Sequence, residues 1–243
     1  MASQKKKYND RYCAGDAASA NLNENIFFGI NLDSEQRVFR DLIYDTEKKI
    51  VFCEAVAGTG KTTVAVATSV LMCQQGKFDD IVYVMHSVGD AQGYLPGDLS
   101  QKSAVWFEGL YQALIMSNLQ PSAVINTESM VNQKNGTGFV TALTDTYLRG
   151  SNIGAGNTKT ILIIDEAQNF PEHNLRKVLS RACENTKVVV IGHSGQIDLY
   201  HPQQSAFRRC MEHFRRKNDP RVGYAELKTN HRGFVSSVAD EPW

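Results

Sequence analysis

The sequence lacks the features that mark a membrane protein, a metal site or an oxidising compartment. No apolar run approaches the roughly 20 residues of a membrane-spanning helix, and residues 1–25 lack the apolar middle of a signal peptide. The five cysteines are an odd number without CxxC spacing, and the six histidines are scattered. Structural disulfides and structural zinc are therefore not expected. We expect a reduced, cytoplasmic protein with no membrane partner.

An excess of one charge is also absent. Lys and Arg number 26, Asp and Glu number 26, and the formal net charge is zero. This balance does not indicate a polyanion partner, although it is compatible with a local basic patch. Residues 1–24 are polar and include Lys5, Lys6 and Lys7. We expect a flexible solvated tail there, with nucleic-acid contact as the alternative, and a single domain over 25–243.

Short apolar runs alternate with amphipathic stretches along the rest of the chain. We predict strands at 49–55, 81–85, 160–166, 187–192 and 222–228, and helices at 34–44, 61–75, 101–117, 172–182 and 203–216. The first four strands are nearly continuous apolar runs, which is typical of a parallel sheet covered on both faces. The alternation predicts an α/β domain with a mostly parallel sheet flanked by helices. Residues 127–158 are the least regular, and we expect an exposed loop or hairpin there.

A glycine-rich segment joins the first of these strands to the second helix. It has the core of a P-loop, and its strand–loop–helix context is the one that this motif requires. The expected phosphate-binding residues are Ala57, Gly58, Thr59, Gly60, Lys61, Thr62 and Thr63. Backbone amides would surround the phosphates at the positive end of the helix, Lys61 would contact the β- and γ-phosphates, and Thr62 would hold Mg²⁺. Ala55 replaces the first glycine of the strict pattern, and a turn without ligand is the alternative.

Two adjacent acids follow the apolar run at 161–164. Asp165 and Glu166 stand at the carboxyl end of a predicted buried strand, which is where ligands of open α/β sheets bind. We predict that Asp165 completes the Mg²⁺ shell begun by Thr62. We predict that Glu166 orients or deprotonates the attacking water. A solvated acidic turn is the alternative, but the upstream P-loop favours an ATP-hydrolysing site.

Five segments, in this order, resemble the PhoH-like family. They are AGTGKT (57–62), YLPGDL (94–99), YLRG (147–150), IIDEAQN (163–169) and GQIDL (195–199). The resemblance covers about residues 31 to 235. It implies one RecA-like P-loop ATPase domain related to the core of superfamily 1 helicases. It also implies an ATPase that acts with RNA or single-stranded DNA and a homo-oligomer, with a hexamer favoured by family analogy.

The wider helicase resemblance implies roles for three further residues. Gln36 resembles the glutamine that reads the adenine edge, and its alternative is a polar residue in an exposed helical turn. Gln196 resembles the glutamine that senses the γ-phosphate. Arg232 resembles an arginine that contacts the γ-phosphate, and we expect it to act across an oligomer interface. A surface arginine is the alternative for Arg232.

Three departures from the family pattern limit what the resemblance implies. His193 replaces an aspartate, and His86-Ser87 replace an arginine-proline pair. The segment between Ser87 and YLPGDL is shortened and lacks a glutamate. These departures weaken the inference, from the family resemblance, of any nucleic-acid contact near 86–93. They leave the P-loop and Asp165-Glu166 intact, so we expect the site to hydrolyse ATP despite His193.

Three functions remain open from the sequence. The first is an RNA-directed ATPase, with helicase activity as a further possibility, and the second is a nucleotide-gated switch or assembly module. The third is a small-molecule kinase with 86–98 and 127–158 as an acceptor lid, but Glu166 and Gln196 suit water activation and phosphate sensing instead. One P-loop supplies half of a helicase motor. We therefore expect neighbouring copies in a ring to complete the site.

Overall fold

The computed structural model describes residues 26–86, 107–126, 138–146, 148 and 152–240. The expected tail at 1–24, the YLPGDL segment and most of YLRG lie outside these ranges. Within them, no helix is long and apolar enough to cross a membrane. The same residues contain no group of three or more His, Cys, Asp or Glu side chains that could hold a metal ion.

A seven-stranded sheet forms the centre of the domain, in the order β5-β6-β4-β7-β8-β3-β9. Each pair of neighbouring strands is parallel. The strands are β3 Ile50–Ala55, β4 Asp80–Met85, β5 Ile125–Asn126, β6 Val140–Thr144, β7 Thr160–Ile164, β8 Thr186–Gly192 and β9 Val222–Leu227. A separate antiparallel hairpin pairs β1 (Ile26–Phe27) with β2 (Ile30–Asn31). The five predicted strands and the parallel α/β architecture are confirmed.

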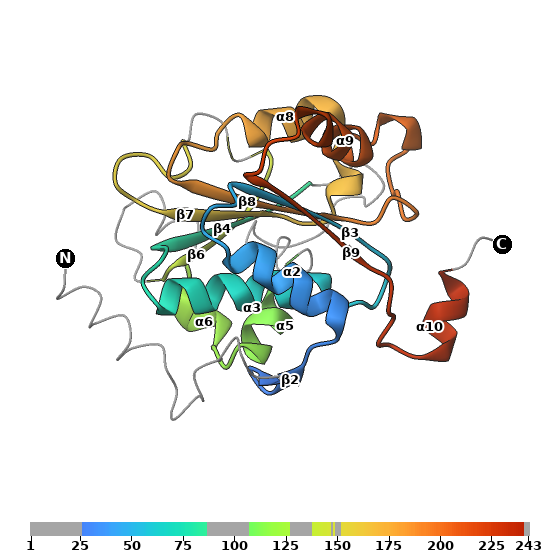
Figure 1. Cartoon of the computed structure of the whole chain (residues 1–243), viewed down its shortest axis with the longest axis horizontal. Coiled ribbons are helices and arrows are strands. Elements are labelled where there is room, and N and C mark those ends of the chain that lie inside the picture. Colours follow the sequence, from blue (N-terminus) through green and yellow to red (C-terminus); the bar gives the residue numbers. More distant parts are fainter. Residues whose placement is uncertain (1–25, 87–106, 127–137, 147, 149–151, 241–243) are drawn as a thin grey trace, which may run out of the picture.

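Helices cover both faces of this sheet (Figure 1). One face carries α2 (Ser34–Tyr44), α3 (Lys61–Gln74), α5 (Glu108–Met116) and α6 (Pro121–Val124), and the other carries α8 (Glu172–Leu179) and α9 (Phe207–Lys217). The short helices η1 (Ala167–Asn169) and η2 (Pro202–Gln204) precede α8 and α9, and α10 (Phe234–Ala239) follows β9. Each face has its own apolar core, because the side chains of the central strands alternate between the two helical layers.

The expectation of a loop or hairpin over 127–158 is wrong for Val140–Thr144, which form β6 in register with β4. Both neighbours of β6, β4 and the two-residue β5, are parallel to it, so no hairpin turn pattern signals the pairing. Residues 127–137 lie outside the described ranges. The helix expected at 203–216 begins at Phe207, since Pro202–Gln204 form the separate turn η2.

The strand register brings four loops to one edge of the sheet. Glu54 on β3 pairs with Gly192 on β8, and Ala55 pairs with Leu227 on β9. Ile164 on β7 pairs with Val190 on β8. The P-loop, the acids after β7, the loop after β8 and the segment after β9 therefore all leave the sheet at its carboxyl edge, where open α/β sheets bind ligands.

Candidate nucleotide-binding site

The P-loop has a backbone that only glycine adopts readily at two positions. Gly58 and Gly60 both have a φ of 73°, in the left-handed region. Gly60 caps the N-terminus of α3, so the amides that follow point out of the helix toward the loop. A Cβ at Gly58 would also lie 2.6 Å from Asn230 Oδ1. The loop therefore forms a cradle at a helix N-terminus, as an anion-binding site requires.

Asp165 connects β7 to the start of α3. Its Oδ2 accepts hydrogen bonds from Thr62 Oγ1 at 2.6 Å and from the Tyr83 hydroxyl at 2.6 Å. Its Oδ1 accepts from the Glu166 backbone N–H at 2.8 Å. The Thr62 hydroxyl and the Asp165 carboxylate thus meet at one point, and hard oxygen donors of this kind suit Mg²⁺. These two residues would hold the metal.

Glu166 stands beside Lys61 at the same edge. Its Oε1 lies 3.6 Å from Lys61 Nζ, and its Oε2 accepts a hydrogen bond from Gln168 Nε2 at 2.6 Å. Its backbone has a φ of 49°, a left-handed conformation that costs a residue with a side chain about 1–3 kcal/mol. Such strain is found at functional sites, and here it turns the carboxylate toward the P-loop lysine.

Tyr83 is a site residue that the sequence analysis missed. It lies on β4, it is 1% exposed, and its hydroxyl donates to Asp165. Burial and the neighbouring Asp165 charge raise the pKa of Tyr83 well above its usual value, so the hydroxyl stays protonated as a donor. If the Thr62 oxygen bound a metal, Tyr83 would still hold the Asp165 carboxylate in place.

We expect Tyr83→Phe to raise the half-maximal Mg²⁺ concentration for turnover about tenfold or more. A hydrogen bond to a charged group contributes about 1.5–3 kcal/mol. The affinity for ATP measured without Mg²⁺ should not change. Tyr224→Phe is the matched control, because the buried Tyr224 hydroxyl has no hydrogen-bond partner among the described residues. An unchanged Mg²⁺ dependence in Tyr83→Phe, or equal effects of both variants, would remove this role.

Glu54 is a second residue that no local pattern marks. It lies on β3 one residue before the P-loop begins to turn, and its two carboxylate oxygens accept from the Ser194 N–H and hydroxyl, both at 2.7 Å. Ser194 belongs to the loop that carries Gln196. The Glu54–Ser194 contact therefore fixes the position of the predicted γ-phosphate sensor relative to the phosphate cradle.

Gln36 packs against the P-loop at the start of α2. Its Nε2 donates to the Thr59 carbonyl at 2.8 Å, and its Oε1 accepts from the Asp33 N–H, which completes a capping box with the N-cap residue Asp33. Its amide oxygen and one of its two N–H groups are thus engaged. One N–H remains for the adenine edge, so the predicted role of Gln36 stays a prediction.

Gln196 lies beside α10 and the P-loop. Its Nε2 donates to Asp240 Oδ1 at 2.8 Å, while Asp240 Oδ2 accepts from the Ala57 N–H at 3.3 Å. His193 is buried nearby, with its Nδ1 3.9 Å from Asp240 and without a hydrogen-bond partner among the described residues. A carboxylate from the C-terminal helix therefore contacts both the P-loop and the residue predicted to sense the γ-phosphate.

Arg232 lies against the P-loop of its own chain. A Cβ at Gly58 would be 3.0 Å from Arg232 Cγ, and the His231 N–H donates to the Gly58 carbonyl at 2.9 Å. The Asn230 side chain accepts from the Arg232 N–H at 2.7 Å and fixes the turn. The side chain is exposed, so its guanidinium is free to reach a bound phosphate.

His86 directly follows β4. Its Nδ1 lies 3.0 Å from Asp145 Oδ1, and its ring packs on Phe170. Burial opposes ionisation of Asp145, but hydrogen bonds from His86 and Asn174 outweigh it and lower the pKa of Asp145 to about 2. His86 is thus bound to a buried carboxylate. Ser87 and the rest of 87–93 lie outside the described residues.

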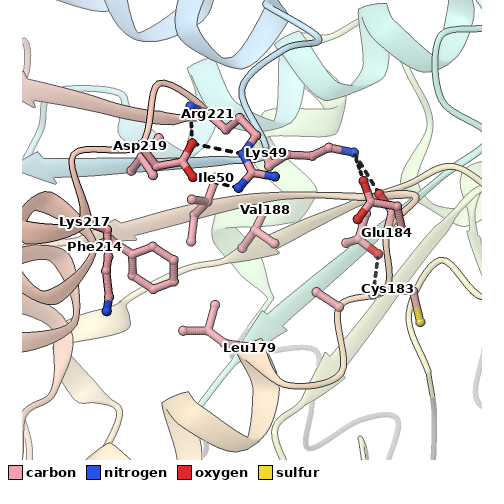
Figure 2. Close-up of a pocket in the computed structure, with 13 residues that line it drawn as sticks. Lys49, Ile50, Leu179, Cys183, Glu184, Val188, Phe214, Lys217, Asp219 and Arg221 are labelled. Carbon is pink, nitrogen blue, oxygen red and sulfur yellow. Dashed lines mark hydrogen bonds and ion pairs between the residues drawn. The ribbon is translucent and has the colours of Figure 1, made fainter.

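A hollow of about 340 Å³ lies at the opposite, amino-terminal edge of the sheet (Figure 2). Figure 2 shows Lys49 extended toward Glu184, and Arg221 facing Asp219. These pairs are 3.0 Å and 2.7 Å apart, so their charges are neutralised locally. The hollow is separated from Lys61, Asp165 and Glu166 by the length of the strands, and it takes no part in the candidate site.

A glycine-rich cradle at the carboxyl edge of a parallel sheet, with a threonine hydroxyl in contact with an aspartate and an adjacent glutamate, is the arrangement of a P-loop NTPase. A family model described as PhoH-like protein matches residues 31–236. The chain belongs to the PhoH-like family.

Curated relatives agree with this assignment. The chain is 31% identical over 204 residues to a PhoH-like protein of Mycobacterium leprae, covering 79% of this chain and 52% of the relative. It is 28% identical over 211 residues to Protein PhoH2 of Bacillus subtilis, covering 84% of this chain and 45% of the relative. The chain thus spans about half the length of the curated relatives it matches.

Solved structures show the same fold at low sequence identity. The HK97 bacteriophage large terminase has a TM-score of 0.53 and 15% identity, over 91% of this chain and 45% of that one. The Sulfolobus solfataricus SWI2/SNF2 ATPase core, solved in complex with dsDNA, has a TM-score of 0.51 and 14% identity, over 91% of this chain and 49% of that one. The expected RecA-like ATPase fold is confirmed.

Proposed function

We propose that the chain binds ATP with Mg²⁺ and hydrolyses it. The observation that supports this is the convergence of four side chains from two elements. Lys61 and Thr62 open α3, and Asp165 and Glu166 directly follow β7, with Thr62 and Asp165 in direct contact and Lys61 3.6 Å from Glu166. Lys61 supplies charge to the phosphates, and Glu166 accepts a proton from the attacking water.

We further propose that hydrolysis is coupled to single-stranded RNA or DNA. Membership of a family that resembles helicase cores supports this. The experiment is phosphate release from ATP, measured with and without a single-stranded RNA and a DNA of the same sequence. We expect at least one strand to accelerate turnover. If neither strand changes the rate of hydrolysis, the proposed ATPase activity would stand but its proposed coupling to nucleic acid would be refuted.

A nucleotide-gated switch is the second candidate, and the Asp240 contacts favour it. The γ-phosphate that Gln196 is predicted to sense would compete with the Asp240 carboxylate for the Gln196 amide, and like charges would repel. ATP would then release α10 from the P-loop, and ADP would allow it to return. Such a change could serve a motor or a switch. Slow hydrolysis that neither RNA nor DNA accelerates would favour the switch.

We also propose a homo-oligomer, with six copies favoured by family analogy, which native mass measurement tests. The contact of Arg232 with Gly58 changes our expectation for this arginine from action in trans to action on its own chain's nucleotide. Mixing Lys61→Ala with Arg232→Ala subunits should therefore leave activity absent, because every subunit carries a defect. Recovery of activity in the mixture would restore the trans role.

A further inference from the structure

Helix α9 concentrates positive charge in a chain that is neutral overall. Its eleven residues include five Arg or Lys and one Glu, a net of +4, against zero for the whole chain. Seven of its positions are exposed, and all except Glu212 are basic or His: Arg208, Arg209, His213, Arg215, Arg216 and Lys217. The apolar side chains Phe207 and Met211 are buried in the core, so this helix cannot insert into a lipid surface.

Helix stability explains only part of this charge. Arg215, Arg216 and Lys217 lie in the last turn, where cations interact favourably with the helix dipole. Arg208 and Arg209 lie in the first turn, where the dipole disfavours cations, and that turn has no acidic residue. Arg209 is paired with Glu172 and donates to the Ser205 carbonyl, but Arg208 has no such contact among the described residues, so its position needs another explanation.

A groove of about 680 Å³ runs between α9 and α8. Apolar side chains and arginines line it, among them Leu175, Leu179, Phe214, Arg176, Arg209 and Arg216. Arg176 and Arg209 already hold the Glu172 carboxylate between them, at 2.7 Å and 3.4 Å. The groove therefore combines guanidinium groups that bind an oxyanion with an apolar lining that includes an aromatic ring. Sites for single-stranded nucleic acid have this combination.

We propose that this α8–α9 groove binds the phosphate backbone of a single-stranded nucleic acid. Arg216 lines the groove, whereas Arg208 lies on the exposed surface of α9 outside the groove lining. Neither has a partner among the described residues, and they are about 12 Å apart along the helix axis at 1.5 Å per residue. Arginine suits this task because its planar fork matches a phosphate with two hydrogen bonds. The proposed surface lies on the helical face of the sheet opposite α2 and α3 (Figure 1).

The groove is joined to the candidate site through one short segment. Phe170 follows η1, which begins directly after Glu166, and its carbonyl accepts from the Ala206 N–H at 3.0 Å. Pro171, at the start of α8, forms a β-bridge with Ser205, just before α9. Both helices of the groove thus start at the segment that carries Glu166. Stimulation of turnover by this route rests on the proposed function, whereas binding in the groove does not.

The test compares two double variants that each remove two positive charges. Arg208→Gln/Arg216→Gln removes one charge from the groove lining and one from the exposed surface of α9 beside it. Lys159→Gln/Lys228→Gln alters exposed lysines away from α8 and α9. Binding of a fluorescent single-stranded RNA 20-mer is measured by anisotropy over a range of salt concentrations. The groove variant should bind at least tenfold more weakly. Its plot of log affinity against log salt should be shallower by about 1.4, since each lost phosphate contact contributes roughly 0.7 for a single strand.

The control variant should bind like the unmodified chain, and both variants should keep the basal ATP turnover measured without RNA. Equal weakening in the two variants would overturn the proposal, because it would reflect net charge alone. No binding of RNA or of DNA by the unmodified chain would also overturn it. If poly-glutamate competes for the groove as well as RNA at equal charge, the ligand would be an acidic polypeptide and the proposal of a nucleic-acid site would be overturned. None of these outcomes depends on ATP hydrolysis, so they are distinct from failure of the proposed ATPase.

Discussion

Lys61→Ala should abolish ATP turnover and weaken ATP binding. Lys61 opens α3 inside the phosphate cradle and lies 3.6 Å from Glu166, where its ammonium would supply a positive charge to the β- and γ-phosphates. Phosphate release and the binding of a fluorescent ATP analogue measure the two effects.

Lys228→Ala is the matched control for this variant. Lys228 is an exposed lysine paired with Glu226, close to the same edge of the sheet, and its loss should leave turnover unchanged. A melting temperature similar to that of the unmodified chain establishes that Lys61→Ala is folded. Undiminished hydrolysis by Lys61→Ala would refute the assignment of the P-loop.

Glu166→Gln should reduce turnover by about 10²–10⁴-fold, which is the usual contribution of a positioned general base. The amide keeps the size of the side chain and can still accept the hydrogen bond from Gln168, but it cannot take a proton. ATP binding in the presence of Mg²⁺ should persist. Asp165→Asn should instead raise the Mg²⁺ concentration that turnover requires, because an amide oxygen is a weaker metal ligand than the carboxylate oxygen that accepts the hydrogen bond from Thr62.

Glu226→Gln, an exposed acid at the end of β9, controls for the loss of a carboxylate. Burst and steady-state phosphate release separate the chemical step from product release in Glu166→Gln. Near-full activity of Glu166→Gln would mean that another group positions the water.

The P-loop and the two acids could be predicted because their signals are local. A glycine-rich turn between a strand and a helix, and an apolar run that ends in Asp165-Glu166, can each be read within about ten residues. The parallel sheet then places both at one edge, as the alternation of strands and helices predicted. Fold class and the centre of the site therefore follow from pattern alone.

The supporting contacts could not be predicted, because they join residues far apart in the sequence. Tyr83 is 82 residues from Asp165, Glu54 is 140 residues from Ser194, and Ala57 is 183 residues from Asp240. Each contact depends on strand order, which no local pattern encodes. The same reason explains why the sequence predicts a loop or hairpin where β6 pairs with β4.

Lys187 gives a further example from the core. Lys187 is the first residue of the strand predicted at 187–192, and it is 2% exposed and donates to the Asp45 and Lys48 carbonyls at 2.7 Å and 2.6 Å. Burial lowers its pKa to about 8. The loop that accepts these hydrogen bonds lies about 140 residues earlier, so only the folded chain reveals why a lysine is tolerated there.

The central claim is that Lys61, Thr62, Asp165 and Glu166 form a Mg²⁺·ATP hydrolysis site. Phosphate release from ATP by the purified chain, with Mg²⁺ and with excess EDTA, measures it most directly, beside Glu166→Gln under the same conditions. The account predicts steady release with Mg²⁺, loss of release with EDTA, and loss in Glu166→Gln. Release that persists in EDTA or in Glu166→Gln, or an unmodified chain that binds no ATP, would contradict it.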